Sequence, residues 1–86
     1  MIETTTFRLA PGTDEVAFLE EDRRVQTSVF YQQPGFIRRT TARGPDGGWI
    51  IITLWRSEAD ADAVAADSAF TALLAGVETR RYTELD

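Results

Sequence analysis

Residues 49–57 form the most apolar stretch of the chain, and the rest of the sequence can be arranged around it. The stretch is rich in β-branched and aromatic residues, which favours a β-strand. Its alternating positions give two rows, which are Trp49, Ile51, Thr53 and Trp55 in one and Ile50, Ile52 and Leu54 in the other. A strand with one solvated face would show polar residues at every second position. Both faces therefore need cover, one from helices and the other from a second sheet, which a chain of this length must take from a partner molecule.

Five further elements follow from the spacing of the apolar residues. The pattern predicts three more strands, over residues 1–9, 36–43 and 77–85, and two helices, over residues 13–31 and 57–76. Thr13 is a suitable N-cap for the first helix, and Ser57 begins a capping-box pattern for the second. Asp67-Ser68 can restart the second helix as a separate turn, and Gly76 is suited to end it.

The order of these elements is β-α-β-β-α-β, the split arrangement of ferredoxin-like domains. Right-handed crossovers place both helices on one face of a four-stranded antiparallel sheet. We therefore predict an α+β fold and a single domain over residues 1–86. The other face of the sheet carries Ile2 and one apolar row of the strand 49–57. We expect a symmetric second copy to bury this face, which makes the protein a homodimer.

The composition excludes several kinds of chemistry. The 86 residues include no cysteine, histidine, lysine or asparagine, and all nine basic residues are arginine. Disulfides, thiolate nucleophiles, histidine bases, Schiff bases and metal or haem sites held by Cys or His are therefore excluded. The net charge of −5 argues against a nucleic-acid partner. The sequence shows neither a basic-then-apolar leader nor an apolar run of membrane-spanning length, so we expect a cytoplasmic protein without a membrane partner.

Four short motifs mark the boundaries of the predicted elements. They are Pro11-Gly12 before the first helix, Pro34-Gly35-Phe36 at the start of the second strand, Thr53-Leu54-Trp55-Arg56-Ser57 leading into the second helix, and Ser68-Ala69-Phe70 near its end. In this order and spacing they resemble the antibiotic biosynthesis monooxygenase-like proteins of the dimeric α+β barrel superfamily. The resemblance covers almost the whole chain. It implies a homodimer whose two sheets form one barrel, with a ligand cleft between sheet and helices in each subunit.

The resemblance also carries an expectation about chemistry. In the oxygenases that this chain resembles, oxygen reacts directly with an electron-rich aromatic substrate, and the protein supplies a pocket and hydrogen bonds without a flavin, a metal or another cofactor. The haem-degrading branch instead has an Asn, a Trp and a His at positions that align with Thr5, Val64 and Leu74 here. All three are replaced, so the resemblance does not extend to haem degradation. The Asn that some cofactor-free oxygenases use is missing as well.

The first predicted helix carries polar residues in the middle of its apolar face. Asp22 and Gln26 lie there one turn apart, and they either pair with a nearby arginine or line a cavity between helix and sheet. Strict alternation puts Arg38 on the same face as Phe36, where it can meet Asp22 or an anionic ligand group. It can equally form a surface salt bridge. Because Asp22 is the only carboxylate on a mostly apolar face, we take Asp22 and Arg38 as the candidate catalytic residues.

Four residues are candidate substrate contacts, namely Thr5, Gln26, Trp55 and Tyr82. Trp55 lies where its strand meets the second helix, so it can be a core anchor or a substrate contact. Tyr82 can orient a substrate or pack with its hydroxyl group at the surface. Thr5 can donate one hydrogen bond to a ligand, although threonine is common on strands for packing reasons alone.

Two functions remain open from the sequence. The first is a cofactor-independent monooxygenase that binds an aromatic or polyketide-like molecule in its cleft. The second is a ligand-binding or structural dimer module without a catalytic set, which the absence of His, Cys, Lys and Asn favours. The location of Asp22 and Gln26 relative to a cavity is the feature that separates the two.

Overall fold

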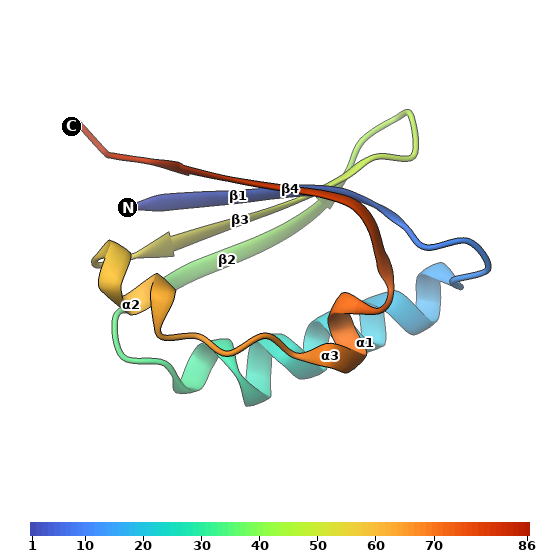
Figure 1. The fold of residues 1–86 in the computed structure, drawn as a ribbon, viewed down its shortest axis with the longest axis horizontal. Helices are drawn as coiled ribbons and strands as arrows, with labels where there is room; N and C mark the ends of the chain where they lie inside the picture. The colour runs from blue at the N-terminus through green and yellow to red at the C-terminus, as the bar shows by residue number, and fades with distance from the viewer.

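The computed structural model describes residues 1–86 and contains one four-stranded sheet with its helices on one face (Figure 1). The strands are β1 (Ile2–Leu9), β2 (Phe36–Arg43), β3 (Trp49–Trp55) and β4 (Leu74–Tyr82). The helices are α1 (Glu15–Ser28), the 3₁₀ turn η1 (Phe30–Gln32), α2 (Glu58–Asp62) and α3 (Ser68–Thr71). The strand order is β2-β3-β1-β4, and all neighbouring strands are antiparallel. The predicted ferredoxin-like α+β fold is confirmed.

The first helix is shorter than predicted at both ends. Its N-cap is Asp14 rather than Thr13, because the Asp14 carboxylate accepts a hydrogen bond from the backbone N–H of Ala17 at 3.1 Å. A carboxylate at this position also interacts favourably with the positive end of the helix dipole. The helix ends at Ser28, and η1 replaces the last predicted turn. Pro34 then favours extended backbone at the residue before it, which prevents the helix from continuing.

The second predicted helix is two short helices, so one continuous helix over residues 57–76 is wrong, and the alternative that Asp67-Ser68 restarts it as a separate turn is confirmed. The connection over residues 63–67 has no regular structure and runs on the helix side of the sheet (Figure 1). Ser57 is confirmed as the N-cap of α2, since its hydroxyl accepts from the backbone N–H of Asp60. The Asp60 carboxylate accepts from the Ser57 hydroxyl and not from its backbone N–H, so only one of the two hydrogen bonds of a capping box forms. Asp67, rather than Ser68, caps α3.

The last strand starts earlier than predicted. β4 begins at Leu74, so Gly76 lies within the strand and does not end a helix. Its φ of +61° accompanies an irregularity in the pairing of β1 with β4. Glycine tolerates this left-handed conformation because it has no Cβ. The strand also ends earlier, at Tyr82 instead of Leu85.

The two faces of β3 differ in burial as its two apolar rows predict. The row that faces the helices is buried, and it consists of Trp49, Ile51, Thr53 and Trp55. The opposite row is half-buried in the single chain, and it consists of Ile50, Ile52 and Leu54. On the helix side, six residues form the hydrophobic core, which are Phe7, Phe18, Val25, Trp49, Ile51 and Phe70. The outer face of the sheet is left without cover by any element of this chain (Figure 1).

β2 does not alternate strictly, and this changes which arginine faces the helices. The pairing of β2 with β3 shifts by one residue between Phe36 and Arg38. An extra residue at such a bulge reverses the direction of the side chains that follow it. Arg39 is therefore buried while Arg38 is exposed. The prediction that Arg38 shares the inner face with Phe36 is wrong for this reason.

No helix of the structure is long and apolar enough to cross a membrane.

Candidate functional site

A cleft of about 360 Å³ lies between the inner face of the sheet and the helices. Its walls come from β1, β2, β3 and β4, from the C-terminal half of α1 and η1, and from the connection between α2 and α3. Most of the lining residues are apolar, and those of the connection are small, namely Val64, Ala65 and Ala66. The cleft exists because no large side chain of this connection fills the space beside β3.

Arg39 forms part of the cleft wall, and side chains of α1 outside the cleft bind its guanidinium. Its guanidinium donates one hydrogen bond to Asp22 at 2.7 Å and weaker ones to Gln26 at 3.3 Å and Thr41 at 3.4 Å. The group also lies over the Phe30 ring, with 4.8 Å from Cζ to the ring centroid. All of these contacts use the terminal nitrogens or the face of the guanidinium. The buried Nε–H of Arg39 has no hydrogen-bond partner.

Trp55 lies on the same side of the sheet and lines the same cleft. Its ring is almost completely buried and packs against Phe30 and Phe36, with centroid separations of 6.0 and 5.7 Å. The sequence analysis left open whether Trp55 is a core anchor or a substrate contact. The structure shows that it is packed in the core and that it also lines the cleft. Its indole Nε1–H is buried without a partner.

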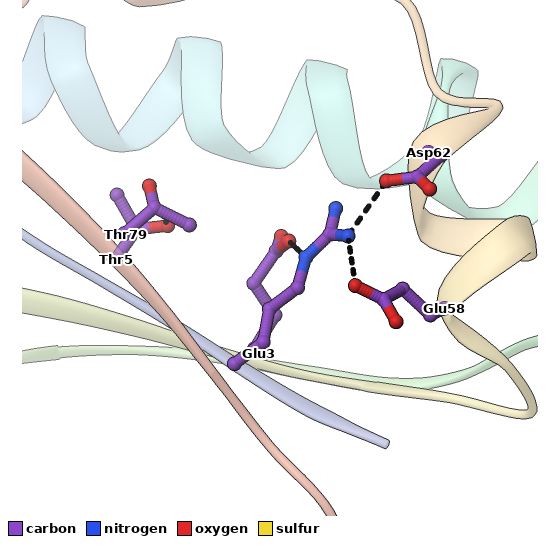
Figure 2. A network of polar contacts seen from close by, with 6 residues as sticks. Glu3, Thr5, Glu58, Asp62 and Thr79 are labelled. Carbon is purple, nitrogen blue, oxygen red and sulfur yellow. Dashed lines mark hydrogen bonds and ion pairs between the residues drawn. The ribbon is translucent and has the colours of Figure 1, made fainter.

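Arg81 closes the edge of the cleft between the sheet and α2. Its guanidinium forms ion pairs with three carboxylates, at 2.6 Å from Asp62, 2.9 Å from Glu3 and 3.3 Å from Glu58. Figure 2 shows these three carboxylates directed towards one another, with the ion pairs as dashed lines. The hydrogen bond to Asp62, followed by that to Glu3, raises the pKa of Arg81 above its ordinary value.

Two hydroxyl groups lie farther along the same wall. Thr5 on β1 and Thr79 on β4 are paired across the strands, and their side-chain oxygens are 3.4 Å apart (Figure 2). Either hydroxyl can donate to the other, which leaves the second free to turn towards a ligand. Both residues line the cleft.

Asp67 fixes the far end of the connection to α1. Its carboxylate accepts from Arg24 at 2.8 Å and from the backbone N–H of Phe70 at 3.0 Å. These two hydrogen bonds, the one from Arg24 first, lower the pKa of Asp67. The connection is thus tied at Asp62 to the sheet and at Asp67 to α1.

The structure brings some of the predicted site residues together and leaves others apart. Thr5 and Trp55 line the cleft. Asp22 and Gln26 do not, because Arg39 lies between them and the cleft; they border a separate depression of about 330 Å³ that opens to solvent. The alternative that they pair with an arginine therefore applies. The partner is Arg39 rather than Arg38.

Arg38 and Tyr82 lie away from the cleft. Arg38 is exposed. Tyr82 borders a shallow depression on the outer face of the sheet together with Thr4, Thr6 and Arg80. Neither side chain reaches the lining residues of the cleft.

Arg39 and Arg81 are the cleft residues that sequence reasoning missed. The available signal for Arg39 was that Asp22 on an apolar face needs a cation, and Arg38-Arg39 offered two. The choice between them depends on the bulge in β2, which strict alternation does not anticipate. For Arg81, the sequence placed the side chain beside Thr79 on one face of the last strand, but nothing indicated the approach of α2.

The charged groups of the cleft are all engaged in ion pairs. Arg39 pairs with Asp22, Arg81 with Glu3, and Asp67 with Arg24. No group of three His, Cys, Asp or Glu side chains is placed to hold a metal ion. The arrangement can therefore enclose an apolar molecule and donate hydrogen bonds to it, but it presents no unpaired carboxylate as a base.

The chain is similar in fold to solved structures, although comparisons of its sequence find no match. No protein-family model matches the chain, and a search of curated proteins gives no match. Among solved structures, the chain is similar to SnoaB, a cofactor-independent oxygenase from Streptomyces nogalater. A SnoaB variant superposes with a TM-score of 0.81 at 21% identity, and a second SnoaB structure with 0.78 at 24% identity; each covers 99% of this chain and 92% of SnoaB.

A second protein shares this architecture. The structure of a variant of MhuD, which contains two manganese protoporphyrin IX molecules per active site, superposes with a TM-score of 0.70 at 17% identity and covers 98% of this chain and 93% of MhuD. The similarity to both proteins extends over nearly the whole chain. At these identities it is the fold that is established, and the chain has the fold of the antibiotic biosynthesis monooxygenase-like proteins that its sequence resembles.

Proposed function

We propose that this protein is a cytoplasmic homodimer that binds an aromatic or polyketide-like molecule in its cleft and acts as a cofactor-independent monooxygenase. The observation that carries the proposal is the cleft itself. Its volume of about 360 Å³ and its mostly apolar walls suit a small aromatic molecule. The similarity to SnoaB, a cofactor-independent oxygenase, supports the choice of chemistry.

The proposed reaction is the oxidation of an activated methylene group of the substrate to a carbonyl group. Molecular oxygen supplies both oxygen atoms: one becomes the carbonyl oxygen, and the other leaves as water with the two methylene hydrogens. The protein binds the substrate, excludes water and donates hydrogen bonds to the substrate oxygen on which negative charge develops. Thr5 and Trp55 are the predicted residues that contact the substrate in this proposal, and Asp22 and Gln26 act indirectly by holding Arg39.

Oxidation of anthrone tests the proposal. The purified protein should convert anthrone to anthraquinone in air faster than buffer alone, with one O₂ consumed for each quinone formed, as followed by absorbance and by an oxygen electrode. The variant Val64→Phe, which fills the cleft, should return the rate to the background. A wild-type rate equal to that of the variant would refute the oxygenase proposal.

A non-enzymatic ligand-binding module is the second candidate. The observation that favours it is the pairing of every charged group in the cleft wall, which leaves no unpaired base to take a proton from a substrate. This candidate predicts that anthrone binds and is recovered unchanged under air. Saturable binding without oxygen consumption would therefore select it over the oxygenase.

The proposed homodimer rests on the outer face of the sheet. The apolar row of Ile50, Ile52 and Leu54, together with Ile2, is only half-buried in the single chain. Native mass spectrometry should give the mass of two chains. Ile52→Asp should shift the protein to the monomer, whereas Val16→Asp, at an exposed site on α1, should not. A monomeric wild-type protein would contradict this part of the proposal.

A further inference from the structure

Two buried N–H groups without hydrogen-bond partners belong to residues that line the cleft. They are Nε of Arg39 and Nε1 of Trp55, and they are the only buried side-chain nitrogen or oxygen atoms of the chain without a partner. A buried donor that makes no hydrogen bond destabilises a protein by about 1–3 kcal/mol. An acceptor from outside the chain would remove this destabilisation at both groups.

The strand pairing places the two donors near each other. Arg39 on β2 lies opposite Thr53 on β3, and Trp55 follows two residues later on the same face of β3. Such diagonal neighbours are about 7–8 Å apart at the backbone. Both side chains also contact Phe30, Arg39 through its guanidinium and Trp55 through its ring. The two residues are therefore neighbours in the same wall of the cleft.

The direction of the Arg39 side chain is set by its other partners. Asp22, Gln26 and Thr41 accept from its terminal nitrogens, so the guanidinium cannot rotate without breaking these hydrogen bonds. Its side chain is almost fully buried. Asp22 is thus a positioning residue that acts through Arg39, and Nε is the one nitrogen of this guanidinium without a hydrogen-bond partner.

The charges around the cleft exclude an anionic ligand. Two arginines line the cleft, Arg39 and Arg81, and a third, Arg24, pairs with the lining residue Asp67. Together they form ion pairs with six carboxylates, which are those of Glu3, Glu21, Asp22, Glu58, Asp62 and Asp67. The surplus of carboxylates repels an anion. The two N–H donors without partners can bind only a hydrogen-bond acceptor, so they cannot bind a cation.

We propose that Arg39 Nε and Trp55 Nε1 determine the specificity of the cleft by binding an acceptor oxygen, of a carbonyl or phenol group, on an aromatic ligand without net charge. This inference rests on the proposed function, because it assumes that the cleft is the ligand site. It adds the residues that recognise the ligand and the charge that the ligand carries.

Matched small molecules test the inference without requiring turnover. The probes are 1-tetralone, its parent hydrocarbon tetralin, and 1,2,3,4-tetrahydro-1-naphthoate, which share one ring system and differ in the oxygen group. Equilibrium dialysis gives the dissociation constant of each. Wild-type protein should bind the ketone at least about tenfold more tightly than the hydrocarbon, and the carboxylate more weakly than the ketone.

The variants remove the donors while keeping the shape of the wall. Trp55→Phe deletes the indole N–H, and the double variant Asp22→Leu/Arg39→Met replaces the buried ion pair by apolar groups, which often leaves stability unchanged. Each should reduce the ratio of ketone to hydrocarbon affinity several-fold while the affinity for tetralin changes little. Trp49→Phe makes the same aromatic change in the packed core and should leave the ratio unchanged.

The outcomes separate this inference from the proposed function. Equal affinity of the wild type for ketone and hydrocarbon, tighter binding of the carboxylate, or a ratio that survives in both donor variants overturns the inference alone. Failure of all three probes to bind overturns it together with the assignment of the cleft. Anthrone oxidation by a protein that shows no ketone preference would leave the oxygenase proposal standing and refute the roles of Arg39 and Trp55.

Discussion

The two ends of the space between sheet and helices are built differently, although β3 runs through both. At the end near the β2–β3 hairpin, Phe18 is completely buried and its ring contacts Phe7, Trp49 and Phe70 at centroid distances of 5.6, 5.0 and 5.7 Å. We call this the packed end. At the end near α2, the cleft remains open, and its walls hold two buried donors without partners.

The two ends differ because different elements cover the sheet at each end. The packed end is covered by α1 and α3, which contribute aromatic side chains. The cleft is covered by the connection over residues 63–67, which contributes small side chains and makes no helix of its own. Close packing stabilises a small domain, whereas unfilled space and unpaired donors destabilise it. The comparison therefore indicates that the packed end maintains the fold, and it supports the proposal that the cleft is the ligand site.

The largest expected effect is at the packed end. Phe18→Ala should lower the free energy of unfolding by about 3–5 kcal/mol, since it removes the central ring of the core and leaves a cavity. Val64→Ala, in the cleft wall, should lower it by about 1 kcal/mol or less because the space beside it is already open. Urea denaturation measures both, with Phe18→Leu as the substitute if the alanine variant does not fold. Equal losses at the two sites would contradict the comparison.

The buried ion pair behind the cleft should give the next largest effect. Arg39→Met alone leaves Asp22 buried without its partner and should destabilise the protein by about 3 kcal/mol. The double variant with Asp22→Leu should recover most of this loss, because neither charge is then unpaired. Thermal unfolding of the two variants and the wild type measures the coupling. A double variant as unstable as Arg39→Met would mean that the pair itself is required for packing.

Filling the cleft should separate stability from binding. Val64→Phe should change the free energy of unfolding by about 1 kcal/mol or less, since it occupies existing space. It should nevertheless weaken binding of 1-tetralone at least about tenfold. Val16→Phe, at a position that is 63% exposed on α1, serves as the matched control and should affect neither quantity. Undiminished ketone binding by Val64→Phe would place the ligand elsewhere.

The smallest effect concerns the ion pair that ties the connection to α1. Because Arg24 and the Phe70 N–H lower the pKa of Asp67, its carboxylate stabilises the fold above the ordinary pKa range of aspartate, and this contribution is lost as the pH falls through the lowered pKa. Asp67→Asn keeps the helix cap but lacks the charge. The wild type should be slightly more stable than this variant at neutral pH and equal to it in strong acid, as measured by urea midpoints. A difference that persists in acid would show that the charge is not its source.

Much of the fold could be predicted because it depends on local patterns. The continuous run of β-branched and aromatic residues in β3 located the strand, and the apolar character of both of its rows showed that both faces need cover. The order of elements then left one sheet with helices on one face. The spacing of Ser57 and Asp60 predicted the start of α2. The two residues form side-chain hydrogen bonds with each other, three positions apart. The position of Asp22 on an apolar face indicated either a pairing with a nearby arginine or a cavity, and the structure shows the pairing, with Arg39. Each of these features involves residues that are close in the chain.

The remaining features depend on contacts between distant residues. A one-residue bulge in β2 decided that Arg39, and not Arg38, meets Asp22, because bulges form where two strands must stay paired. Asp67-Ser68 indicated locally that the second helix can restart there, but the ion pair of Asp67 with Arg24 on α1, 43 positions away, had no signal in the sequence. The cleft itself is a volume between elements that no linear pattern encodes. The sequence thus determined which surfaces must be buried and which charges must be paired, and the tertiary structure decided which partners met and where space was left, since both depend on how separate elements pack.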